Sequence, residues 1–144
     1  MSTAGENGRT RVPNRTLPGK YMLGSWQSLG ASDAQKILEE EIITTQQLLV
    51  VRCVYRSGSD FPAHAHQQEQ ITIVESGTLD FVVNGDEVRV GPGQMISVFP
   101  GVLHSTHAAG ETPVRALNIF HPPAARAPEV RRARTARVRQ AGVV

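Results

Sequence analysis

The chain has 144 residues, of which 40% are hydrophobic, and this suits one globular domain with a real core. Its single cysteine, Cys53, excludes an intramolecular disulfide, and no apolar run is long enough for a membrane span. The net charge of +2 is unevenly spread, because residues 21–121 hold eleven of the 13 acidic residues but only five of the 15 basic ones. This acidic middle argues against a nucleic-acid-binding core, since a surface that follows phosphates should itself be basic.

The first elements along the chain are the least regular. Residues 1–18 are rich in Gly, Asn, Thr, Arg and Pro and predict a flexible arm. They include no apolar segment of a secretory signal, so we expect a cytoplasmic protein. Residues 32–42 are ambiguous, because Ser32 or Asp33 could cap a helix, whereas a strand that begins at Ile42 would suit the rest of the chain.

The following elements have the pattern of strands. Residues 78–90 predict a hairpin, because Asn84-Gly85 separates two β-prone runs. Other strands are expected in four segments: 47–55, 69–76, 95–99 and 114–120. Short strands between Gly and Pro turns predict an all-β sandwich or barrel. We expect this domain to span residues 19–124 and a basic tail to follow at 125–144.

The histidines of the segment HAHQQEQ predict a metal site. Residues two apart on a strand share a face, so His64, His66 and Gln70 should converge while Glu69 points away. His104, which follows a Pro-Gly turn, supplies a further imidazole. Three imidazoles and one amide oxygen suit a divalent first-row metal and leave positions open for water or substrate.

The spacing of these residues resembles the cupin family. The first cupin motif, G-x5-H-x-H-x3-E-x6-G, matches Gly58, His64, His66, Gln70 and Gly77, with Gln in place of Glu. In the second motif, G-x5-P-x-G-x2-H-x3-N, three residues match (Gly93, Gly101 and His104), while Phe99 replaces Pro and Ala108 replaces Asn. The resemblance covers roughly residues 40–122 and implies a double-stranded β-helix, or jelly-roll, barrel.

Two groups of cupin enzymes share the Gln ligand. Relatives that linearise unsaturated uronic-acid sugars carry Asp and Arg where this chain has Asn118 and Ala124, and Asn118 cannot serve as a base. The chain is more similar to small cupin cyclases of aromatic polyketide biosynthesis. That resemblance implies aldol ring closure and dehydration of a poly-β-ketone, which a Lewis-acidic metal would promote. A metal-dependent cupin dioxygenase or a sugar-acid-modifying cupin remains the alternative, and a non-catalytic ligand-binding cupin is the third.

The same resemblance suggests further site residues. Metal-bound water is the first candidate for the base, followed by Tyr55 and His107, although His107 has the wrong parity relative to His104 on a regular strand. Thr106, Asn118 and Phe120 are expected to line the substrate pocket. Zinc is the favoured metal because cyclisation needs no redox chemistry, but nickel, iron, manganese and cobalt also suit this ligand set.

The expected binding partners are inferred from the resemblance to small cupins and from the charge of the C-terminal tail. Small cupins tend to dimerise through their N-terminal strands and sheet faces, so a homodimer is expected. The basic tail could steer an acidic acyl carrier protein that delivers the polyketide, or it could simply be solvated. Neither a nucleic acid nor a membrane is an expected partner.

Overall fold

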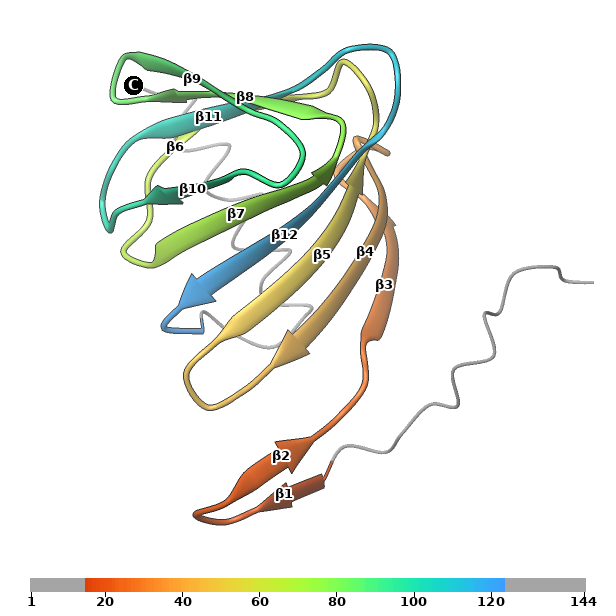
Figure 1. The fold of residues 1–144 in the computed structure, drawn as a ribbon, viewed down its shortest axis with the longest axis vertical. Helices are drawn as coiled ribbons and strands as arrows, with labels where there is room; N and C mark the ends of the chain where they lie inside the picture. Colours follow the sequence, from red (N-terminus) through yellow and green to blue (C-terminus); the bar gives the residue numbers. More distant parts are fainter. Residues whose placement is uncertain (1–14, 124–144) are drawn as a thin grey trace, which may run out of the picture.

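The computed structural model describes residues 15–123, and the expected N-terminal arm and basic tail lie almost entirely outside that range. Within the range the chain is all-β, as predicted (Figure 1), and it contains no helix that could cross a membrane. The strands are β1 Arg15–Leu17, β2 Tyr21–Leu23, β3 Gln27–Ser32, β4 Ile37–Thr44, β5 Leu49–Tyr55, β6 Asp60–His64, β7 Glu69–Ser76, β8 Thr78–Val83, β9 Asp86–Val90, β10 Met95–Val98, β11 His104–Ala109 and β12 Val114–His121.

Two sheets face one another and form the barrel (Figure 1). The larger sheet has six strands in the order β10-β7-β12-β5-β4-β3, and the smaller has four in the order β6-β11-β8-β9. The side chains between the sheets form one apolar core, to which Leu49, Val51, Leu79 and Phe81 contribute. Burying such side chains is the main force that holds two sheets together.

The hairpin predicted at Asn84-Gly85 is confirmed. β8 and β9 pair antiparallel from Leu79↔Val90 to Val83↔Asp86, and the two turn residues have positive φ angles of 47° and 90°. At Gly77, the last glycine of the first cupin motif, both the backbone angle and the space available require glycine. Its φ is 78°, and a Cβ there would lie 2.9 Å from the Val114 side chain. The chain can therefore pass from β7 to β8 only with glycine at this position.

The helix considered for residues 32–42 is wrong. Asp33, Ala34 and Gln35 form a turn with positive φ angles, and β4 begins directly after it at Ile37, five residues before the expected strand start at Ile42. β4 pairs on both sides, with β3 and β5. These pairings override the helix propensity of the Leu and Glu residues, because a central strand gains a hydrogen-bonded ladder along both edges.

Candidate metal centre

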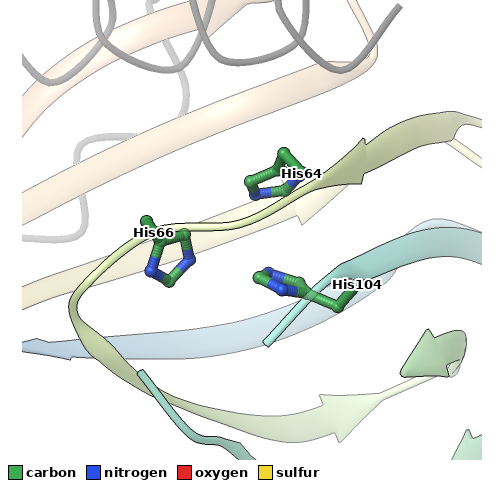
Figure 2. A group of neighbouring side chains, drawn as sticks. All are labelled: His64, His66 and His104. Carbon is green, nitrogen blue, oxygen red and sulfur yellow. The ribbon is translucent and has the colours of Figure 1, made fainter. Parts of the chain in front are cut away.

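Strand pairing brings the three histidines of the two motifs together (Figure 2). β6 ends at His64 and pairs antiparallel with the beginning of β11, so that His64 lies opposite His104. His66 lies in the loop between β6 and β7. The backbone N–H of Gly101 donates to the carbonyl of His66 at 2.8 Å, which ties this loop to the turn that precedes His104.

The three imidazoles form a compact cluster. Their ring centroids lie 4.4 Å apart for His64 and His104, 5.0 Å for His66 and His104, and 5.6 Å for His64 and His66. Their candidate ligand nitrogens all lie within 4.8 Å of one another. Three nitrogens this close can reach a single ion after small side-chain adjustments, because a zinc–nitrogen bond is about 2.0–2.1 Å long.

Backbone carbonyls hold the outer nitrogen of each ring. The Nδ1 atoms of His64, His66 and His104 lie 3.0, 3.0 and 2.9 Å from the carbonyl oxygens of Pro62, Gln68 and Val102. A carbonyl oxygen can only accept, so each Nδ1 carries a proton, and the Nε2 of a neutral ring then presents a lone pair. Neutral imidazoles oriented through the other ring nitrogen are typical of metal ligands.

The interior of the cluster contains more acceptors than donors. The Nε2 of His104 is buried and has no hydrogen-bond partner among the described residues. Burial lowers the pKa of His104 to about 4, so this ring is neutral at pH 7. The Oε1 of Gln70 lies 3.1 Å from the Nε2 of His66, where two lone pairs would repel each other. A cation between these atoms would remove the mismatch, so the residues present fit a divalent metal.

A comparison with known families assigns the fold. The family model described as the cupin domain matches residues 51–120, a segment that holds both histidine motifs. The barrel has the cupin fold. No protein of curated function matched the chain.

Solved structures with this cupin fold share little sequence with the chain. KdgF from Halomonas sp. has a TM-score of 0.60 at 22% identity, covering 69% of this chain and 87% of that one. AerE from Microcystis aeruginosa has a TM-score of 0.62 at 17% identity, with 78% and 51% covered. An RmlC-like cupin from Shewanella frigidimarina has a TM-score of 0.56 at 21% identity, with 72% and 97% covered. Such low identities relate the fold and not the activity.

The segment HAHQQEQ is not one strand in the cupin domain, so this part of the prediction is wrong. The chain leaves β6 after His64 and returns to a sheet only at Glu69. Gln70 is nevertheless brought to the cluster, because it is the first inward-facing residue of β7 and is buried. Glu69 has the opposite parity, and its carboxylate accepts a 3.4 Å hydrogen bond from the Ser97 hydroxyl.

The three residues predicted to line a pocket have different surroundings. Phe120 is buried, and its ring packs edge-on against His66 with the centroids 5.9 Å apart. Asn118 is buried and makes hydrogen bonds to Thr72 and Tyr55. Thr106 is half-buried on β11, with the parity of His104. Of these three residues, Phe120 is the one whose side chain packs directly against the histidine cluster.

The two side chains considered as bases do not join the cluster. The Tyr55 ring is buried against Phe61, and its hydroxyl accepts a 2.8 Å hydrogen bond from Asn118. His107 is half-exposed, and its Nδ1 lies 2.6 Å from the carboxylate of the exposed residue Asp60. The parity of His107 relative to His104 already argued against it, and His107 is not among the three clustered histidines.

Sequence reasoning missed Thr72. This residue is 1% exposed, lies two positions after Gln70 on β7, and accepts a hydrogen bond from the Gln70 amide at 3.0 Å. The spacing between Gln70 and Thr72 could have predicted this contact, because residues two apart on a strand share a face. Polar residues on an inward face need partners, so Thr72 could have been assigned to the same polar group as Gln70.

The lowered pKa of His104 predicts how the stability of the metal-free protein depends on pH. The unfolded chain takes up the proton near pH 6.5 and the folded chain only near pH 4, so acid favours unfolding. The contribution of the neutral His104 ring to the free energy of unfolding is fully present above pH 6.5. It should fall by at most about 3 kcal/mol as the pH drops to 4. Urea unfolding at several pH values measures it. Subtracting the profile of His104→Ala isolates this histidine, and identical slopes would contradict the assignment.

Proposed function

We propose that this cupin is a metal-dependent cyclase that catalyses aldol-type ring closure and dehydration of a poly-β-ketone in aromatic polyketide biosynthesis. The observation that carries the proposal is the charge of the donor set. The group comprises His64, His66, His104 and the amide oxygen of Gln70, all of which are neutral. No carboxylate joins this group among residues 15–123.

A divalent ion held by these four side chains would keep its full charge and would act as a Lewis acid on a ketone oxygen. Zinc suits this role best, because the reaction involves no change of oxidation state. The imidazoles and the amide add no negative charge that would weaken this effect.

The chain's own residues would supply orientation and exclude water. Phe120 packs against His66 and places an apolar ring beside the donor set. A polyketone would lay its methylenes against this ring with one carbonyl directed at the donor set. In ring closure the carbon between two carbonyls loses an acidic proton and bonds to a ketone carbon, and the aldol then loses one water.

Elemental analysis combined with product profiling tests the function. We expect about one metal ion per chain, and a nascent aromatic polyketide should yield more cyclised, dehydrated product with the protein than without it. Chelation should stop the reaction, and zinc should restore it. Equal products with and without protein would exclude the cyclase, and stoichiometric oxygen consumption would favour the dioxygenase alternative instead.

We also propose that the chain forms a homodimer through the β1–β2 hairpin. Figure 1 shows this hairpin standing apart from both sheets, and all six of its strand residues are exposed. Four of them are large apolar residues, namely Leu17, Tyr21, Met22 and Leu23. An isolated hairpin is marginally stable in water, so packing against a second copy would stabilise it.

Light scattering checks this assembly. The unmodified chain should have the mass of a dimer, and the double variant Leu17→Ser/Leu23→Ser should have the mass of a monomer. Val88→Ser, which changes an apolar residue of similar exposure on β9, is the matched control and should stay dimeric. A monomeric unmodified chain would rule the dimer out.

An acyl carrier protein as the partner of residues 125–144 stays a prediction, because those residues lie outside the described range.

A further inference from the structure

A chain of buried side-chain hydrogen bonds leads from the metal centre into the barrel. The Gln70 amide contacts His66 through Oε1 at 3.1 Å, and its Nε2 donates to the Thr72 hydroxyl at 3.0 Å. Thr72 in turn donates to Asn118 Oδ1 at 2.7 Å, and Asn118 Nδ2 donates to the Tyr55 hydroxyl at 2.8 Å. Buried polar side chains that are linked in this way constrain one another's orientation.

The direction of these hydrogen bonds determines which end of the Gln70 amide faces the histidines. A threonine hydroxyl has a single proton, and a carbonyl oxygen such as Asn118 Oδ1 can only accept it. The Thr72 oxygen is therefore left as an acceptor for the amide nitrogen of Gln70. The Gln70 oxygen must then face the histidines, and oxygen is the only amide atom that can bind a cation.

The orientation of Asn118 is compatible with its other neighbours. Its Nδ2 donates to the Tyr55 hydroxyl, and the same nitrogen lies 3.9 Å from the sulfur of Cys53. Asn118 and Thr72 are direct cross-strand partners on β12 and β7, and both are at most 2% exposed. Groups that are carried on paired central strands keep their geometry better than groups on loops.

We propose that Thr72 and Asn118 are positioning residues that hold Gln70 as an oxygen donor to the bound metal. The inference rests on the proposed metal-dependent function. Neither residue needs to touch the ion. Without the acceptor that Asn118 provides, the Thr72 proton would turn to Gln70 Oε1, and the amide would rotate to present its NH2 group to the metal.

Zinc affinity, measured by competition with a chromophoric chelator, tests the proposal without any assay of turnover. Thr72→Val and Asn118→Leu should each lower the affinity by roughly 10–100-fold, as is usual when a partner of a ligand is lost. Thr72→Ser keeps the hydroxyl and should retain the affinity. Ser59→Ala removes a buried hydroxyl elsewhere and is the matched control. Circular dichroism verifies folding, and Thr72→Ala carries the same expectation if Thr72→Val does not fold.

Repeating the Thr72→Val substitution in a Gln70→Glu protein distinguishes a positioning role of Thr72 from a general loss of packing. In Gln70→Glu either end of the carboxylate is an oxygen, so the hydrogen-bond chain is no longer needed to select the donor atom. Thr72→Val should then change zinc affinity by less than about threefold. An equal loss in both backgrounds, or no loss in the glutamine background, would overturn the proposal. A wild-type chain that binds no zinc would overturn the proposed metal function as well, so the two failures can be told apart.

Discussion

Replacing His104 by alanine is expected to abolish metal binding and, with it, the proposed cyclase activity. His104 is 1% exposed, and its Nε2 has no partner among the described residues that would compensate for its burial. Loss of a partner of a metal ligand commonly lowers affinity 10–100-fold, so loss of a ligand itself should lower it by more than about 100-fold. Elemental analysis after dialysis measures the effect directly.

The fold of this variant should survive, because the substitution also removes a buried polar atom that has no partner among the described residues. His107→Ala is the matched control. It makes the same chemical change three residues along β11, at a half-exposed side chain whose recorded partner is the exposed residue Asp60. His107→Ala should keep the metal. A His104→Ala protein that retains one tightly bound ion per chain would show that the three-histidine site is misassigned.

Replacing Gln70 by glutamate is expected to separate metal affinity from catalysis. The carboxylate adds a negative charge 3.1 Å from the His66 ring nitrogen, at the position where the neutral amide oxygen lies now. Affinity for zinc should rise, because an anionic ligand attracts the cation more strongly. The rate of ring closure should fall about tenfold or more, because a neutralised ion polarises a ketone less, and each 1.36 kcal/mol of lost stabilisation costs a factor of ten.

Gln67→Glu provides the control, because it adds the same charge at an exposed position three residues earlier. It should leave both zinc affinity and product yield unchanged. The informative measurements are zinc competition and single-turnover product formation on the same preparation. If Gln70→Glu cyclised the polyketide as fast as the parent protein, the neutral donor set would not be the reason for the activity, and the proposed function would lose its main support.

Local sequence features predicted those parts of the fold that depend on local chemistry. The Asn84-Gly85 turn could be read directly, because a type I′ hairpin demands two residues with positive φ. The strands expected at 69–76 and 114–120 are confirmed as β7 and β12. The turn at Asp33–Gln35 was not predicted, because its residues carry no glycine signal, and the strand after it contains Leu and three Glu residues. Its β conformation comes from pairing with β3 on one edge and β5 on the other, and the composition of residues 37–44 alone does not show these pairings.

The sequence by itself determined the donor atoms of this cupin: the spacings of His64, His66, Gln70 and His104, and the absence of a charge at position 70. Only the tertiary structure decided how those atoms are directed. The register of β6 against β11 sets His64 opposite His104, and three backbone carbonyls hold the outer ring nitrogens. The chain through Thr72 and Asn118 turns the amide oxygen inward. Each ring is held by a carbonyl two residues away, but the amide of Gln70 depends on the hydrogen bond between Thr72 and Asn118, which lie on strands far apart in the sequence and whose pairing residue spacing alone does not encode.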